Sequence, residues 1–434
     1  MKKWGLIIGL GILFNLLSSF KWTWEEQREF NTFFESKTLR IDYELVGDAV
    51  SEEFVLKQLK KQEIWAGPQR LVNGYNLDLG NYIFTVYDSI TNEPLYKGGF
   101  CSLFGEWQTT EEAKTTKESY YHVNLIPFPK NTIKYVLEKR KFSDGKFETI
   151  TELYINPSNY FILNEPVNPY EYSIVQGGRN SQYKIDIAFI AEGYTQDEMK
   201  KFKQDVKKTW DYITSIHPFD LLKDKFNVYA VESPSVESGT DIPGENIYKN
   251  TILNSSFYTF NTPRYLTSKD LKSMHDIAAI VPYDYIFVLI NSDRYGGGGF
   301  YNYYSATTSD HGYSLKVAIH EFGHGFAGLA DEYYDSDVAY DDYYNLNVEP
   351  WEPNITTLVD FDKKWKDMVP ESFEIPTSRN YDYRDSVGVY EGGGYATKGI
   401  YSPFQDCRMK SNIPDGFCPV CTEAIKKVIK YYTK

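Results

Sequence analysis

Residues 314–333 constrain the fold more than any other stretch, because they combine an apolar helical pattern with two regularly spaced histidines. At their centre is an H-E-x-x-H motif, residues 320–324. Residues four apart lie on the same face of a helix, so His320 and His324 can bind one metal ion. Glu321 stands one step round the helix, where it can hold a metal-bound water without being a ligand itself. The motif therefore predicts a metal centre on a buried helix.

The flanking residues support this interpretation. An apolar run at 315–319 indicates that the helix is buried, and Gly325 and Gly328 predict where it ends. Asp331 follows seven residues after His324 and is a plausible third ligand, with its neighbour Glu332 as the rival. The alternative is a helix with two hydrogen-bonded histidines and an acidic loop after it.

Three protein ligands and one water are the pattern of a catalytic zinc ion, Zn²⁺. Zinc lowers the pKa of its water towards about 7, and Glu321 can take the proton and pass it to a leaving amine. In thermolysin-like enzymes the third ligand lies in an E-x-x-x-D setting, and none follows His324 in this sequence. In metzincins the third ligand follows a glycine-assisted turn, and a later Met lies below the metal. The sequence favours the second arrangement.

The first 20 residues have the pattern of a secretory signal peptide. Two lysines precede an apolar run at 4–17, and two serines follow it near a candidate cleavage site. An uncleaved anchor is the alternative, because the run approaches the length of a membrane span. We expect a secreted, periplasmic or cell-surface protein with no stable membrane span after signal cleavage.

The formal charge is −14 and the pI about 5.1, with no basic cluster. Nucleic acid and anionic membrane surfaces are therefore poor partners. We expect a monomer whose partner is an extracellular protein or glycoprotein substrate.

The chain divides into a β-rich and an α/β part. Residues 21–155 predict a β-sandwich, since short alternating runs are separated by turns, at 39–45, 81–87, 118–125, 132–137 and 147–154. Residues 156–180, with Asn-Pro, Glu-Pro and Gly-Gly steps, indicate a connector. Residues 181–434 carry buried strands at 183–191, 226–231 and 285–290, and a helix at 196–216 for which Thr195 and Glu198 form a capping box. The predicted class is α+β and multidomain.

A run of glycines precedes the histidine helix. Gly297, Gly298 and Gly299 let the backbone approach another chain closely. An edge strand here is where a peptide substrate could add as an extra strand. A flexible surface loop is the alternative.

The four cysteines are Cys101, Cys407, Cys418 and Cys421. An exported chain permits disulfides, and the last three can form only one bridge among themselves. A structural bridge is the favoured prediction, and a second metal site is the alternative.

Residues 320–333, HEFGHGFAGLADEY, resemble the active-site segment of the bacterial IgA peptidase family, a metzincin-like group of secreted zinc endopeptidases. Other matching stretches are 190–195, 390–395, 406–411 and 417–421. The resemblance covers roughly residues 180–434, and the β-rich part resembles the extra domain that precedes it in many members. It implies an N-terminal β-sandwich followed by a metzincin-like α/β zinc peptidase domain.

Carried over by position, the resemblance implies His320, His324 and Asp331 as zinc ligands, Glu321 as general base and Met409 as the Met-turn. Gly328 and Asp331 each stand one residue later than the H-E-x-x-H-x-x-G-x-x-H pattern would place them. Asp is shorter than His, so the extra backbone residue could bring its carboxylate to the same point.

Two further predictions concern side chains near this centre. Tyr395 and Tyr401 lie shortly before Met409, where some metzincins carry a Tyr that stabilises the oxyanion. An acidic run could hold a calcium ion, Ca²⁺, or be a solvated loop, and its residues are Asp335, Asp337, Asp341 and Asp342.

The leading hypothesis is an exported zinc endopeptidase that hydrolyses peptide bonds in extracellular proteins or glycoproteins. A catalytically inactive binding or adhesion module is the second, although the intact Glu321 argues against it. A zinc amidase of another class, acting on cell wall, is the third.

Overall fold

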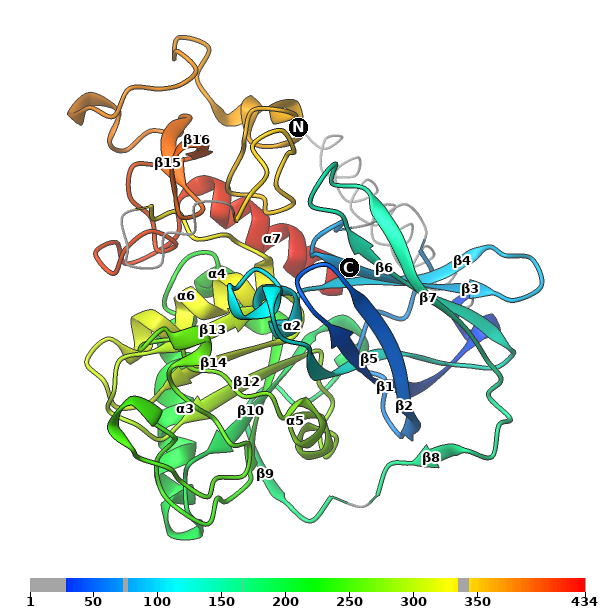
Figure 1. Cartoon of the computed structure of the whole chain (residues 1–434). Helices are drawn as coiled ribbons and strands as arrows, with labels where there is room; N and C mark the ends of the chain where they lie inside the picture. The colour runs from blue at the N-terminus through cyan, green and yellow to red at the C-terminus, as the bar shows by residue number, and fades with distance from the viewer. Residues whose placement is uncertain (1–28, 73–76, 167, 335–342, 434) are drawn as a thin grey trace, which may run out of the picture.

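Two four-stranded sheets form the N-terminal part of the chain in the computed structural model, which describes residues 29–72, 77–166, 168–334 and 343–433 (Figure 1). The first sheet has the order β5-β1-β2-β8. Its strands are β1 (Phe34–Gly47), β2 (Glu52–Gln62), β5 (Glu118–Pro129) and β8 (Ile162–Asn164). The second has the order β4-β3-β6-β7. Its strands are β3 (Tyr82–Asp88), β4 (Pro94–Phe100), β6 (Ile133–Arg140) and β7 (Phe147–Ile155).

The alternating pattern that predicted these strands also builds their core. Leu39, Ile41 and Tyr43 of β1 are fully buried and share one apolar cluster with Phe84 of β3 and Leu137 of β6. Side chains two residues apart lie on the same face of a strand, so one face of each sheet supplies this core. The β-rich N-terminal part is therefore confirmed.

The segment 156–180, expected as a connector, joins the two parts through two strands. The short β8 pairs with β2 in parallel and extends the first N-terminal sheet. A second strand, β9 (Glu171–Gln176), pairs antiparallel with β11 (Phe226–Glu232) and begins the next sheet. The Asn-Pro, Glu-Pro and Gly-Gly dipeptides of this segment lie outside the two strands, so the strands can form.

A six-stranded sheet of order β13-β14-β12-β10-β11-β9 forms the centre of the C-terminal part. Its remaining strands are β10 (Ile185–Glu192), β12 (Tyr285–Ile290), β13 (Gly297–Phe300) and β14 (Tyr304–Thr308). β10 pairs in parallel with β11 and β12, and β12 in parallel with β14. The edge strand β13 runs antiparallel to β14. Every residue of β10 and β12 is buried, as expected for parallel strands covered on both faces.

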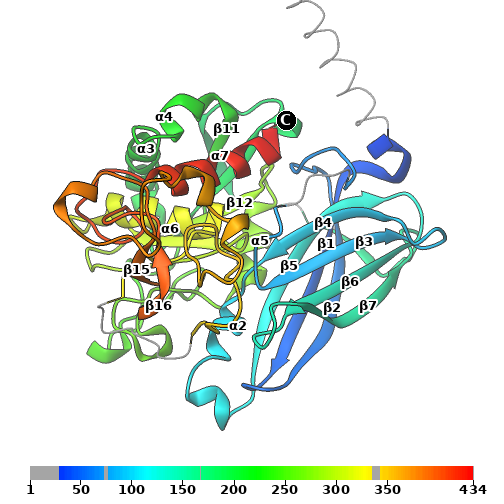
Figure 2. The same ribbon diagram turned by 90° about the horizontal axis from the view of Figure 1, so that it is seen from above.

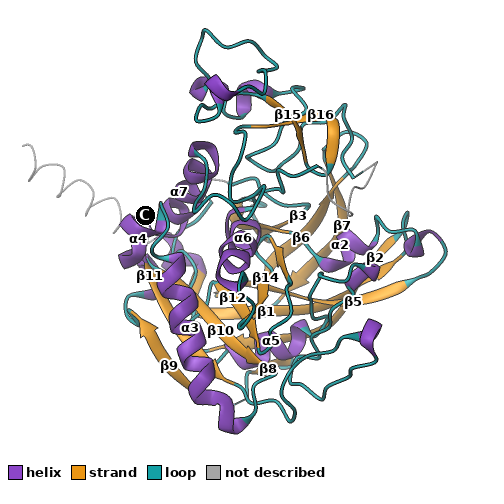
Figure 3. Ribbon diagram, turned by 90° about the vertical axis from the view of Figure 1, so that its left-hand side faces the viewer, coloured by secondary structure: helices purple, strands orange, loops and turns teal. Residues whose placement is uncertain are grey.

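Helices cover one face of this sheet, and the N-terminal part of the chain lies against the opposite face (Figures 2 and 3). The helix-covered face shares one apolar core with three helices. These helices are α3 (Met199–Ile213), α6 (Ser314–Ala327) and α7 (Pro419–Thr433). The second face shares its core with α5 (Leu271–Ala278) and with the N-terminal sheets. The two parts of the chain are therefore joined by one continuous apolar core.

Local signals explain the beginning of α3. The predicted capping box is formed, because the Thr195 side chain accepts from the Glu198 N–H and the Glu198 carboxylate accepts from the Thr195 N–H. Residues 196–198 form a single 3₁₀ turn before the α-helix, which ends at Ile213 rather than 216. The remaining elements are α2 (Leu103–Trp107), α4 (Phe219–Leu222) and the hairpin of β15 (Tyr390–Gly393) with β16 (Ala396–Ser402).

None of the helices in the described ranges has the length and apolar character needed to cross a membrane. The predicted signal peptide at 1–20 lies outside the described residues. The acidic run predicted as a possible calcium site also lies outside the described residues. Its members are Asp335, Asp337, Asp341 and Asp342.

Candidate metal centre and active-site pocket

Helix α6 carries the histidine motif and is held against the central sheet by its apolar side. Ile319, Phe322 and Phe326 are buried among residues of β10, β12 and α3. The prediction that Gly325 ends the helix is wrong, since α6 continues to Ala327. A Cβ atom at residue 325 would stand 1.7 Å from the Tyr285 hydroxyl, so this glycine permits close packing on β12.

Gly328 ends the helix and turns the chain back towards it. Its φ of +64° lies in the left-handed region, and its N–H donates to the carbonyl of His324. The N–H of Leu329 donates to Gly323, which closes the turn. Asp331 is thereby directed at the histidine face of α6.

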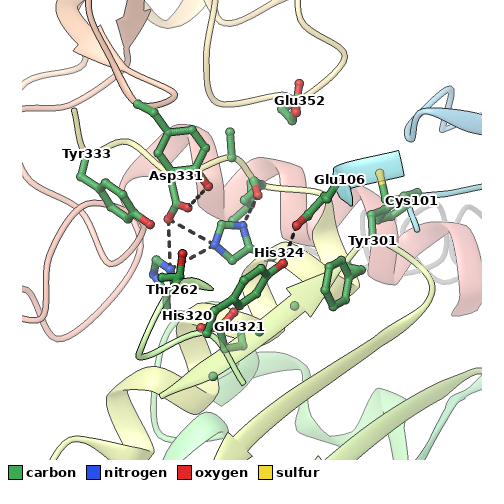
Figure 4. Close-up of a pocket in the computed structure, with 18 of the residues that line it drawn as sticks. Cys101, Glu106, Thr262, Tyr301, His320, Glu321, His324, Asp331, Tyr333 and Glu352 are labelled. Carbon is green, nitrogen blue, oxygen red and sulfur yellow. Dashed lines mark hydrogen bonds and ion pairs between the residues drawn. The ribbon is translucent and has the colours of Figure 1, made fainter. Parts of the chain in front are cut away.

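The structure brings three predicted ligands together (Figure 4). The Nε2 atoms of His320 and His324 are 3.0 Å apart. Oδ1 of Asp331 lies 3.1 Å from the first and 3.2 Å from the second. Ligands bound to zinc at about 2.05 Å in tetrahedral geometry stand about 3.3 Å apart, so this triangle has the size of a zinc site.

Backbone carbonyls fix the orientation of both imidazole rings. Nδ1 of His320 lies 3.0 Å from the carbonyl oxygen of Arg408, and Nδ1 of His324 lies 2.6 Å from that of Leu329. A nitrogen facing a carbonyl carries a proton, so in the neutral form of each ring Nε2 would present its lone pair to the centre of the triangle. This is the tautomer that a metal ligand requires.

The carboxylate of Asp331 also fits a cation. Asp331 is 5 % exposed, and its Oδ1 faces the two imidazole nitrogens. Burial alone would raise the pKa of Asp331, but the charge of His324 and hydrogen bonding to both histidines hold it well below its ordinary value. Burial lowers the pKa of His324, whereas the Asp331 carboxylate raises it, with a net value of about 9. The Asp331 carboxylate thus stabilises a proton on His324, and a metal ion bound there would replace that proton.

Tyr395 positions this carboxylate. Its hydroxyl donates to Oδ2 of Asp331 at 2.6 Å, and its ring packs edge-on against Tyr333. The other predicted tyrosine, Tyr401, does not line the pocket, and its backbone pairs with Thr356. The sequence predicts Tyr395 as an oxyanion stabiliser, and in this structure its hydroxyl contacts the carboxylate of Asp331, a predicted ligand.

Glu321 lies between the histidines and the edge strand β13. Burial raises the pKa of its carboxyl above the ordinary value, against the effect of the two histidines. A Cβ atom at Gly297 would stand 2.8 Å from Oε1 of Glu321, and one at Gly299 would stand 2.4 Å from its backbone oxygen. These glycines therefore let β13 lie directly against α6.

The edge of β13 is partly occupied, which limits the predicted addition of a substrate strand. Gly297, Gly298 and Gly299 all line the pocket. The carbonyl of Gly297, however, accepts a hydrogen bond from the N–H of Leu266 at 3.2 Å. An added strand would have to begin beyond this point.

Met409 lies beneath the motif. It is fully buried, and a Cβ atom at Gly323 would stand 2.8 Å from its sulfur. Its carbonyl accepts a hydrogen bond from the N–H of Glu332. The structure thus places Met409 under the helix turn that joins His320 to His324.

Both parts of the chain line a pocket of about 400 Å³ around these residues. Figure 4 shows Tyr333 on one side of the histidines and Glu106 of α2 on the other. Tyr265 donates a hydrogen bond to Glu106, and burial raises the pKa of Glu106 to about 7. Sequence reasoning missed these three side chains, since no motif marks Glu106 and only the Asp-Glu-Tyr context pointed to Tyr333.

The favoured disulfide prediction is wrong for this structure. All four cysteines are free, and the Sγ atoms of Cys407 and Cys421 are 3.9 Å apart, far beyond a disulfide bond of about 2.05 Å. Glu332, the rival ligand, turns away from the histidines and lies with Cys407, Cys418 and Cys421.

Family models account for most of the chain. The model described as IgA Peptidase M64 matches residues 174–384 and 378–429. The model described as Peptidase M64 N-terminus matches residues 29–151. No curated protein matches the chain significantly.

Proposed function

The chain belongs to the IgA Peptidase M64 family, a metallopeptidase family, and on this premise we propose that it is an exported zinc-dependent endopeptidase of metzincin type. One observation carries the proposal. A buried carboxylate oxygen of Asp331 faces the Nε2 atoms of His320 and His324 at 3.1 and 3.2 Å. Two imidazole nitrogens that converge with a buried carboxylate oxygen form a site where a bound cation offsets the cost of burying the negative charge.

The two imidazoles and the carboxylate are the donor types that zinc prefers in catalytic sites. When bound there, zinc would lower the pKa of a coordinated water towards about 7 and polarise the scissile carbonyl group.

Residues around the metal centre transfer the proton and hold the ligands in position. Glu321 accepts the proton of the attacking water and returns it to the leaving amine nitrogen. Its buried position, with a raised pKa, suits a group that must both take and give a proton near neutral pH. Tyr395 holds Asp331 in place through its hydrogen bond to Oδ2.

Two features support the metzincin assignment. An antiparallel edge strand, β13, borders the pocket beside the motif helix. Met409 lies beneath that helix at Gly323, where the Met-turn is expected.

The substrate class follows from the pocket and from the family. The pocket is lined by backbone at Gly297–Gly299 and by polar side chains of both parts of the chain, which suits an extended peptide. We propose extracellular proteins or glycoproteins as substrates, with immunoglobulin A, named in the family description, as the first to test.

Cleavage mapping tests this proposal. The protein and its Glu321→Ala variant are incubated with immunoglobulin A, other secretory proteins and a mixed proteome, and new peptide termini are identified by mass spectrometry. We expect termini that appear with the wild type and not with the variant. A zinc-loaded wild type that produces no Glu321-dependent termini would overturn the enzyme assignment.

A further inference from the structure

A second group of metal-ligand side chains lies apart from the histidine centre. The carboxylate of Glu332 and the thiols of Cys407, Cys418 and Cys421 are all buried, and their donor atoms lie within 4.8 Å of one another. They come from three segments: the residues after α6, those before Met409, and the start of α7. No motif in the H-E-x-x-H region accounts for them.

The spacing of the sulfur atoms fits a shared ion. Zinc–thiolate bonds of about 2.3 Å in tetrahedral geometry place sulfur atoms about 3.8 Å apart. Sγ of Cys407 and Sγ of Cys421 are 3.9 Å apart. Oε1 of Glu332 lies 3.1 Å from Sγ of Cys421.

Glu332 supplies the independent observation. The residue is fully buried, and its Oε2 has no hydrogen-bond partner. Asn354 donates to Oε1 at 2.9 Å, which fixes the carboxylate and leaves its other oxygen free. A buried carboxylate oxygen in this state is costly unless it binds a cation or a proton.

Backbone N–H groups point at two of the three thiols, those of Cys407 and Cys418. The N–H of Cys418 points at Sγ of Cys407 at 3.2 Å, and the N–H of Cys421 points at Sγ of Cys418 at 3.5 Å. Cys418 directly precedes α7, and Cys421 lies in its first turn. Helix N-termini stabilise thiolates, which are the form that binds metal.

We propose that Glu332, Cys407, Cys418 and Cys421 bind a second, structural zinc ion. Four protein ligands leave no position for water, which distinguishes such a site from a catalytic one. The ion would crosslink three segments of the chain. These segments adjoin the proposed active site, because Asp331 directly precedes Glu332 and Met409 follows Cys407 by two residues. The proposal does not depend on peptidase activity.

Metal analysis of the full-length protein, purified without chelator, tests the proposal. We expect two zinc ions per chain in the wild type and one in the His320→Ala/His324→Ala variant. After cobalt replaces zinc in this variant, thiolate-to-cobalt charge-transfer absorption in the near ultraviolet should remain. A variant that binds no metal, or cobalt without this absorption, would overturn the proposal.

Thiol counting distinguishes the site from a disulfide without any ligand substitution. In the Cys101→Ser variant, a mercurial reagent should titrate three thiols and release one zinc ion. This control substitution leaves all four proposed ligands in place and should retain two zinc ions. A single titratable thiol would mean that the other two form a disulfide, and the proposal would be wrong.

Discussion

Asp331 and Glu332 are consecutive residues whose carboxylates point into different clusters. Oδ1 of Asp331 lies 3.1 Å from Nε2 of His320, whereas Oε1 of Glu332 lies 3.1 Å from Sγ of Cys421. The two side chains are therefore not alternatives for one ligand position. Each completes its own set of donors, and the short backbone between them couples the two sets.

This division predicts different metal contents for two substitutions. Asp331→Ala should lose the zinc held by the histidines, and with it cleavage activity, because it removes one of three ligands. Glu332→Gln should keep that zinc and weaken the other, since the neutral amide is a poorer ligand. Zinc per chain, measured after dialysis against a weak chelator, checks this. Full zinc retention in Asp331→Ala would contradict the assignment.

Tyr395→Phe should weaken metal binding without removing a ligand. The substitution deletes the 2.6 Å hydrogen bond to Oδ2 of Asp331. Loss of such an outer partner typically costs about 10–100-fold in metal affinity or activity. Competition with a fluorescent zinc chelator measures the affinity. Tyr401→Phe is the matched control, because Tyr401 does not line the pocket, and an equal loss in both variants would refute a specific role for Tyr395.

Gly325→Ala should destabilise the protein although Ala is the better helix former. The propensity gain is about 1 kcal/mol. The added Cβ would stand 1.7 Å from the Tyr285 hydroxyl, and overpacking of this kind costs about 1–3 kcal/mol or more. Urea denaturation should give a lower midpoint than for the wild type.

Two companion variants identify the cause. Gly312→Ala meets nothing within 4 Å and should leave the midpoint unchanged. Removing the Tyr285 hydroxyl together with Gly325, as Gly325→Ala/Tyr285→Phe, should recover part of the loss. A double variant no better than the sum of its parts would point to another origin of the strain.

A buried carboxyl pair should make stability depend on pH. Burial raises the pKa of Asp186 from 3.8 to about 6, and burial together with the charge of Asp186 raises the pKa of Asp284. Well below pH 4 these carboxyls are protonated in both the folded and the unfolded state. As pH rises to 6, the unfolded chain loses protons first, so stability falls, by at most about 3 kcal/mol for Asp186.

Asp284→Asn should reduce this dependence. The amide oxygen can still accept the 2.8 Å hydrogen bond from the Asp186 N–H, while the like charge is gone. Urea midpoints should be measured from pH 4 to 8. As pH rises, the stability of the variant should increase relative to that of the wild type. Asp382→Asn, at an exposed position, is the control. A constant difference across this range would show that the pair does not titrate as described.

Local patterns sufficed to predict about half of the strands, the helix that carries the histidines, and the capping box at Thr195, because each depends on residues close in sequence. The role of Gly325 was not predictable in this way. A glycine after a helical motif looks like a terminator, and only the tertiary contact with Tyr285 shows why it lies inside the helix.

At the histidine centre and in the pocket around it, too, the sequence predicts contacts between nearby residues and does not predict contacts between distant ones. The histidines and Glu321 follow from helical spacing, whereas the choice between Asp331 and Glu332 depends on the direction of the chain after Gly328. The contact of Glu106 with Tyr265 joins residues 159 apart. Pairing across such a separation leaves no periodic signal in one sequence.

The central claim is that Glu321 is the general base of a zinc peptidase, and it is tested most directly by measuring zinc content and cleavage rate together. For the wild type and Glu321→Gln, kcat/KM is determined on one substrate identified by cleavage mapping. If Glu321 is the general base, zinc at the histidine site should be equal in the two proteins and the rate about 10²–10⁴-fold lower in the variant. Equal zinc with equal rates would contradict it.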